Sequence, residues 1–292
     1  MSIQWDKKKF TSYLVWTFTV SWILQIIGSI FANQGNQMVF SPIMCVAMYG
    51  PFLGAVMAKI PLKGMGWKPK FKGNVKYIFV ALWMPALLSS LGAILYFVFF
   101  PDRLDLTGKY LIEMQGEALM EQLSAQGITV PMYLGSFAIS AVTYAPFFNM
   151  FVALGEEVGW RGAMQPMLND RLGKFRGRIV GGIIWGAWHW PVMILAGYEY
   201  GKEYFGAPFL GMAMFCLFTT VGGILLDTIY EKTQCIWLPS LAHGAINAFS
   251  LVGYIVEPEY MDQYILGPVP IGIIGMIPAL IMAGWILFKN KE

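Results

Sequence analysis

The chain has 292 residues, of which 57% are hydrophobic and only 13% are charged, and its mean hydropathy is +0.57. Soluble domains carry about a quarter charged residues, so this composition excludes a soluble globular protein and predicts a polytopic membrane protein. The net charge of +3 is small, and nothing in its distribution indicates binding to nucleic acid. The three cysteines, Cys45, Cys216 and Cys235, lie singly in apolar surroundings, which favours buried hydrophobic residues over disulfides.

Long apolar stretches divide the chain into segments that could cross a membrane, which takes about 20 residues each. A polar run at 33–37 separates the first two. The predicted helices are 10–32, 40–60, 77–99, 132–157, 179–197, 207–228, 236–256 and 265–288. We therefore expect an all-α protein with eight transmembrane helices, forming a single integral domain over 1–292. The first helix is too long for a cleavable signal peptide and lacks a small-residue cleavage site.

The basic residues predict the orientation of these helices. Of the 20 Lys and Arg residues, only Arg103, Lys109 and Lys202 fall in the loops that would lie outside if the amino terminus is inside. Cytoplasmic segments of membrane proteins are enriched in Lys and Arg, so both termini are expected in the cytoplasm. The outer segment 102–121 is acidic, and its spacing predicts an amphipathic helix on the outer interface.

Ionisable side chains inside a bilayer are costly and usually do chemistry or transport. The only two histidines, His189 and His243, both lie in predicted spans, and Glu156 and Glu157 end another. Adjacent helical residues point about 100° apart, so the two glutamates serve different roles. Glu157 and Arg161 have the spacing of an intrahelical ion pair, which leaves Glu156 to face elsewhere. The alternative is that both glutamates cap the cytoplasmic end of the helix.

His243 and Asn247 are four residues apart and share one helix face, while His189 is about 15 Å from the basic boundary. We expect Glu156, His189, His243 and Asn247 to form a water-activating centre, with ordinary packing of each histidine as the alternative. Small residues beside these sites are expected to let helix backbones approach closely. These residues are Gly155, Gly159, Gly186 and Gly244.

Three motifs on separate predicted helices resemble one family. They are Glu156-Glu157-Val158-Gly159-Trp160-Arg161, Trp185-Gly186-Ala187-Trp188-His189 and His243-Gly244-Ala245-Ile246-Asn247. In order and spacing they are similar to the CAAX-protease and bacteriocin-processing family of integral-membrane proteins, which includes the Ras-converting CAAX endopeptidases. The resemblance covers a motif-bearing core at about 130–255. The second motif usually begins with Phe, whereas here Trp185 supplies the aromatic wall.

The resemblance implies an intramembrane endopeptidase. Glu156, helped by His189, would take a proton from a water that attacks the scissile carbonyl. His243 and Asn247 would donate hydrogen bonds to the oxyanion.

Glu157 and Arg161 would give structural support by holding the base in register. This mechanism needs no metal. An alternative cofactor is zinc or another divalent metal, bound by Glu156, His189 and His243 with one position open for water.

The expected partners are a peptide or lipidated protein substrate, such as a CAAX-like tail, and membrane lipid. Because the motifs fall in the cytoplasmic half of their predicted helices, the active site is expected toward the cytoplasmic side of a prokaryotic plasma membrane. Three other functions use similar sequence features. They are a proton-coupled transporter, a non-catalytic immunity or scaffold protein, and a lipid-modifying enzyme, although the last lacks a visible additional nucleophile.

Overall fold

A computed structural model of the protein describes residues 3–70 and 72–289, and within them the regular secondary structure is helical, with one isolated antiparallel bridge between Leu104 and Val256. The all-α class is therefore confirmed. In chain order the elements are α1 (Lys7–Asn33), α2 (Gln37–Ala47), α3 (Gly50–Met57), α4 (Val75–Phe99), η1 (Pro101–Arg103), α5 (Lys109–Gln115), α6 (Glu117–Ala125), α7 (Val130–Val142), α8 (Ala145–Glu157), η2 (Val158–Met164), α9 (Gln165–Trp188), α10 (Trp190–Ala196), α11 (Phe209–Thr233), α12 (Trp237–Ala248), η3 (Leu251–Ile255), η4 (Pro258–Gln263) and α13 (Ile273–Lys289).

Five helical runs within the described residues are long and apolar enough to cross a membrane, or six if the bent pair α6 and α7 counts as one span. The eight continuous spans predicted from the sequence are not all present. The predicted helix 132–157 divides into α7 and α8, with Pro146 starting the second, since proline lacks the amide that would continue the first. The last predicted helix begins only at Ile273, beyond two prolines, Pro268 and Pro270.

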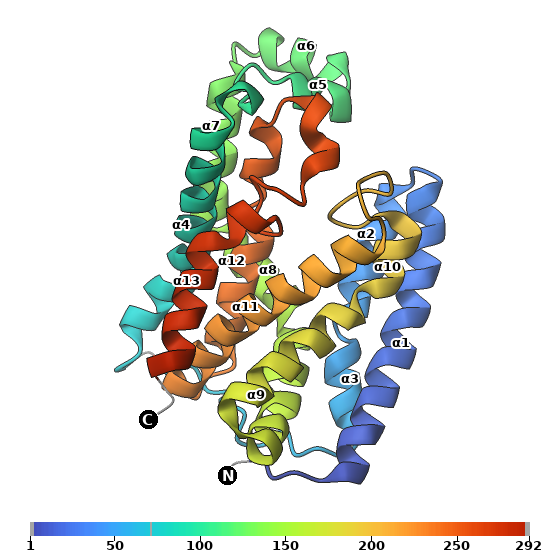
Figure 1. Cartoon of the computed structure of the whole chain (residues 1–292), viewed down its shortest axis with the longest axis vertical. Helices are drawn as coiled ribbons and strands as arrows, with labels where there is room; N and C mark the ends of the chain where they lie inside the picture. The colour runs from blue at the N-terminus through green and yellow to red at the C-terminus, as the bar shows by residue number, and fades with distance from the viewer. Residues whose placement is uncertain (1–2, 71, 290–292) are drawn as a thin grey trace.

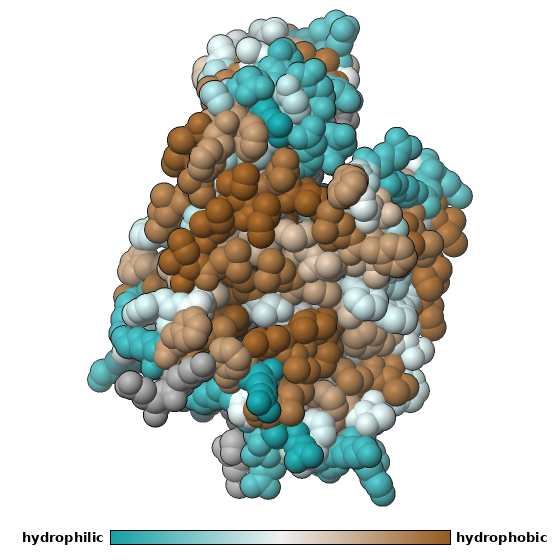
Figure 2. All heavy atoms as spheres, in the orientation of Figure 1, coloured by the Kyte–Doolittle hydropathy of each residue, from teal (hydrophilic) through white to brown (hydrophobic). Residues whose placement is uncertain are grey.

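The longest apolar run, Ala145–Ala196, is bent rather than straight. Gly173 within α9 has φ 75° and ψ 157°, which no α-helix contains, so the helix is interrupted there. Figure 1 shows α9 then rising from the end of the molecule that holds both termini toward α10. Figure 2 shows hydrophobic residues gathered in a band across the middle of this face, with hydrophilic residues at both ends.

Small residues bring the helices of the site into backbone contact. A Cβ on Gly244 of α12 would lie 2.6 Å from the amide nitrogen of Met150 in α8, and one on Gly155 would lie 2.7 Å from the Cα of Tyr49. Side chains larger than hydrogen would therefore push these helices apart. The close packing predicted at the motif glycines is confirmed, and it holds the third motif against the first.

The segment predicted as one outer amphipathic helix is two short helices, α5 and α6, separated at Gly116 (φ 79°). Backbone hydrogen bonds join its start to η3 and η4, from Asp105 to the carbonyl of Ile255 (3.0 Å) and from Glu257 to the carbonyl of Arg103 (2.9 Å). These elements form a cap at the end of the molecule opposite the termini (Figure 1).

Candidate active site

The two glutamates of the first motif are buried in the middle of a continuous helix rather than capping its end. Glu156 and Glu157 form the last residues of α8 and are 1% and 0% exposed, and the chain continues as the π-helical turn η2. Such turns widen a helix locally and are frequent at functional sites. From this turn, Trp160 Nε1 donates to Glu156 Oε2 at 3.0 Å, and Arg161 Nη1 donates to Glu157 Oε1 at 2.9 Å. The predicted Glu157–Arg161 ion pair is confirmed.

Trp185 of α9 connects all three motifs. Its indole N–H donates to Glu156 Oε2 at 2.6 Å, and its backbone carbonyl accepts from His189 Nδ1 at 3.0 Å. Its ring lies 4.3 Å from the Arg161 guanidinium, a cation–π contact, and 5.3 Å from the ring of His243. The sequence predicted only an aromatic wall here. The indole N–H, which Phe would lack, was the available signal for this role.

His189 lies at the junction of α9 and α10 and is surrounded by aromatic side chains. Its ring stacks on Tyr198 with centroids 6.0 Å apart and meets Phe215 edge-on at 4.7 Å. Because a carbonyl can only accept, the bond to Trp185 means that Nδ1 carries a proton. Nε2 is therefore the nitrogen left to accept a proton from a substrate or water.

Gln25 of α1 binds the backbone at the helix break beside His189, a role that no sequence pattern indicated. In an unbroken helix the amide of Val192 would donate to the carbonyl of Trp188. Here Gln25 stands between them, since its Nε2 donates to the Trp188 carbonyl (2.9 Å) and its Oε1 accepts from Val192 (3.4 Å). Trp22 also donates to the Trp188 carbonyl, at 3.1 Å. A fully buried side chain of α1 thus fixes the backbone on both sides of His189.

His243 of α12 is held by the first motif. Its Nδ1 lies 2.8 Å from Glu157 Oε1, the same oxygen that accepts from Arg161. Because the ionised carboxylate accepts, Nδ1 donates and Nε2 is free for other partners. The second oxygen, Glu157 Oε2, is buried without a hydrogen-bond partner among the described residues. Glu157 therefore supports His243 as well as the helix turn, which the sequence did not predict.

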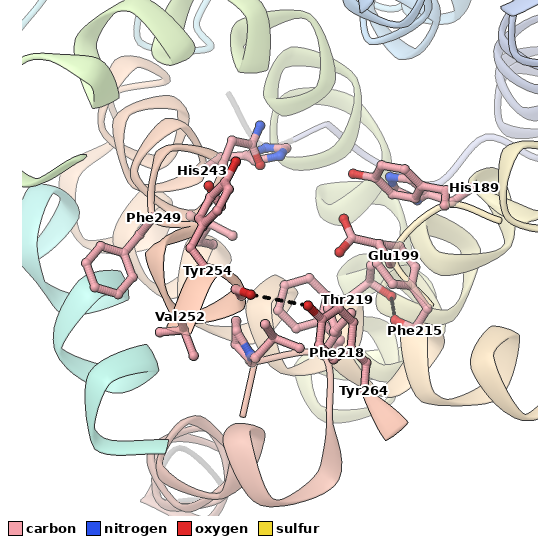
Figure 3. Close-up of a pocket in the computed structure, with 18 of the residues that line it drawn as sticks. His189, Glu199, Phe215, Phe218, Thr219, His243, Phe249, Val252, Tyr254 and Tyr264 are labelled. Atoms are coloured by element: carbon pink, nitrogen blue, oxygen red, sulfur yellow. Dashed lines mark hydrogen bonds between the residues drawn. The ribbon is translucent and has the colours of Figure 1, made fainter. Parts of the chain in front are cut away.

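Both histidines line a cavity of about 330 Å³, shown in Figure 3, and Asn247 and Trp185 line it with them. Asn247 is exposed in the cavity, one helical turn beyond His243. Glu156 does not line the cavity and lies one side chain back, behind the Trp185 indole that binds it. The structure therefore brings His189, His243 and Asn247 together around one cavity, and Glu156 joins them through its hydrogen bond to Trp185.

The zinc alternative does not fit this arrangement. Among the residues that the structure describes, no three His, Cys, Asp or Glu side chains come together in a group that could hold a metal ion. Glu156 Oε2 accepts from two indoles, and Glu156 does not line the cavity that His189 and His243 line. The three side chains predicted to converge on a metal therefore do not share one open space.

The cavity lies at the end of the molecule away from the termini. Its wall includes Tyr110 and Tyr254 of the cap, whose rings are 5.5 Å apart. It also includes the loop after α10, where Lys202 donates to Asn33, the last residue of α1. The sequence predicted an opening toward the basic end, where α1 begins, and the side of the membrane that the cavity faces stays a prediction.

Comparison with known proteins agrees with the motifs. Residues 138–249 match the family model described as type II CAAX prenyl endopeptidase Rce1-like, and this range includes all three motifs. The chain is also similar to a protein of Methanococcus maripaludis named CAAX prenyl protease 2, with 24% identity over 239 residues, covering 80% of this chain and 81% of that protein. The resemblance read from the motifs is confirmed: both comparisons lead to the CAAX prenyl endopeptidases, and they support a membrane protease.

Proposed function

We propose that the protein hydrolyses peptide bonds within the membrane, using a water molecule activated by Glu156 with the help of His189. The observation that carries this proposal is the link through Trp185, which binds Glu156 by its indole and His189 by its carbonyl. Oε2 of Glu156 accepts the hydrogen bonds from Trp160 and Trp185. The other carboxylate oxygen, Oε1, takes the proton from the water. General-base assistance of this kind contributes about 10²- to 10⁴-fold to rate.

In the same proposal His243 and Asn247 stabilise the oxyanion of the tetrahedral intermediate. With Nδ1 bonded to Glu157, His243 can donate to the oxyanion only from Nε2, and only as an imidazolium. The Asn247 amide supplies a second donor from the same helix face. Loss of one oxyanion donor costs about 10²- to 10³-fold in kcat.

The substrate is a peptide held at the membrane, either a lipidated protein tail or a membrane-spanning peptide. The cavity supports this because its wall is largely aromatic and aliphatic, with Phe215, Phe218 and Ile271 among its residues. The name of the Methanococcus relative refers to prenylated tails. A prenylated peptide and an unmodified transmembrane peptide of the same sequence would separate the two substrate types.

We assign the protein to a prokaryotic plasma membrane with the basic end, and both termini, in the cytoplasm. The support is that 17 of the 20 Lys and Arg residues fall in the segments assigned to that side. Because Tyr110 and Tyr254 of the cap line the cavity, we infer that with this orientation substrate enters from the opposite side. Right-side-out membrane vesicles should then cleave an added peptide and inverted vesicles should not. The reverse result would put the active site on the cytoplasmic side.

The purified protein, reconstituted in lipid with a fluorogenic membrane-anchored peptide, tests the mechanism. Glu156→Gln and His189→Ala are each expected to lower kcat by at least about 10²-fold, in line with loss of a general base. Glu203→Gln, an exposed glutamate of the loop after α10, is the matched control and should leave kcat unchanged. Cleavage that persists at the wild-type rate in Glu156→Gln would rule out this mechanism. If no peptide is cut but ion flux depends on Glu156, the protein is a transporter.

A further inference from the structure

The active-site cavity contains one acidic side chain that the three motifs do not include. Glu199 lies in the loop after α10, and it is the only Asp, Glu, Lys or Arg among the described residues that line the cavity. Figure 3 shows its carboxylate directed into the open space, with His189 on one side and His243 and Tyr254 across the cavity. Any substrate that reaches the histidines from the cap end therefore passes this charge.

The backbone at Glu199 is held in an unusual conformation. Its φ of 71° lies in the left-handed region, which is strained for a non-glycine residue and persists only where the surroundings enforce it. The loop is fastened on both sides, because Tyr200 donates to the carbonyl of Ile271 at 2.9 Å and Lys202 donates to Asn33 at 2.8 Å. Glycine would suit this position better, so the carboxylate is held in the cavity at a conformational cost.

The charge of Glu199 has no cationic partner among the described residues. Lys202 of the same loop donates to Asn33 at 2.8 Å, and Lys109 of the cap pairs with Glu257 at 2.7 Å. Burial raises the pKa of Glu199, and a hydrogen bond with Tyr198 only partly offsets this. A carboxylate that is partly withdrawn from water without a counter-charge gains most from a cation supplied by a ligand.

Tyrosine rings surround the same space. Tyr110, Tyr198, Tyr254 and Tyr264 all line the cavity with Glu199. Aromatic faces attract Lys and Arg side chains, and this attraction adds to that of a carboxylate when water is excluded. A substrate carboxyl terminus would meet the opposite situation, since no Lys or Arg lines the cavity to receive it.

We propose that Glu199 is a specificity-determining residue that binds a Lys or Arg side chain of the substrate close to the scissile bond. This inference rests on the proposed endopeptidase function and narrows its substrate class. The peptides preferred by this protein carry a basic residue beside the cleavage site.

A matched set of membrane-anchored fluorogenic peptides tests the proposal. The peptides differ only in one residue, which is Lys, norleucine or Glu, moved in turn through the positions flanking the scissile bond. At one or more positions the wild-type protein should cleave the Lys peptide with a kcat/KM at least about tenfold above that of the Glu peptide, as expected for one charged contact. Glu199→Gln should reduce this Lys/Glu ratio by about the same factor, and Glu199→Lys should invert it.

Two further variants make the result decisive. Glu199→Gly removes the carboxylate while suiting the left-handed backbone, so it should lose the ratio without loss of thermal stability. Glu203→Gln, in the same loop but outside the cavity wall, should keep the ratio. Equal cleavage of all three peptides by the wild type, or an unchanged ratio in Glu199→Gln and Glu199→Gly, overturns the proposal. If the wild type and Glu156→Gln are equally inactive on every peptide, the proposed endopeptidase function itself fails, and this proposal with it.

Discussion

Gln25→Met tests how the break between α9 and α10 positions His189. Methionine has a similar length and fills the same buried space, but it can neither donate to the Trp188 carbonyl nor accept from Val192. The Trp188 carbonyl keeps its bond from Trp22, so one buried backbone group, the Val192 amide, loses its partner. Leaving one such group unpaired costs about 1–3 kcal/mol of stability.

The substitution should also affect catalysis. Without the Gln25 amide, the unpaired Val192 amide is drawn toward the Trp188 carbonyl, which would turn the backbone at His189. A displacement of about 1 Å in a catalytic group costs roughly 10²-fold in rate. We expect Gln25→Met to lower kcat by about this factor, with a fall in melting temperature measured in detergent. Gln37→Met, an exposed glutamine of α2, is the control and should change neither quantity. A kcat within twofold of wild type, together with the expected loss of stability, would refute the positioning role.

Three other perturbations have expected outcomes. Arg178→Met leaves Asp227, its buried partner at 2.6 Å, without a counter-charge and should lower the free energy of unfolding by about 3–5 kcal/mol. The double variant Arg178→Met/Asp227→Leu should recover most of this stability. Thermal unfolding of the wild type and the two variants checks this. Gly244→Ala forces α12 away from α8 and should lower both stability and kcat. The control is Gly135→Ala, whose added Cβ meets nothing within 4 Å, and it should lower neither. Equal stability and kcat in the two variants would contradict the packing argument. Burial raises the pKa of Asp105, but hydrogen bonds from Thr107 and from neighbouring amides outweigh it and hold that pKa below 3.8. The carboxylate therefore stabilises the cap above about pH 4. In the wild type, amide hydrogen exchange in residues 104–110 should accelerate only below that pH. In Asp105→Asn the same amides should exchange faster already at neutral pH.

Pairs of residues spaced four apart on a helix predicted much of the site. The Glu157–Arg161 pair follows from helix geometry alone, and the structure has it. The motif glycines predicted close helix packing, because a position without a Cβ next to buried polar residues usually marks a backbone contact. Both features depend on neighbours within one helix or on the absence of a side chain, which a sequence displays directly.

The contacts that the sequence missed join residues far apart in the chain. Gln25 and Val192 are 167 residues apart, and no local pattern connects them. The sequence predicted a connecting segment between 157 and 179, whereas the structure has helix on both sides of Gly173, which has positive φ. Glu199 was overlooked because it belongs to a loop, where spacing carries no information about direction.

The central claim is that a water molecule activated at Glu156 attacks the peptide bond directly. Single-turnover cleavage in water enriched in oxygen-18, followed by mass spectrometry of the products, measures this step. We expect one labelled oxygen in the newly formed carboxyl group, no product adduct when hydroxylamine is present, and no product from Glu156→Gln within the wild-type reaction time. A hydroxylamine adduct, which would reveal a covalent acyl-enzyme, or normal labelled product from Glu156→Gln, would contradict the account.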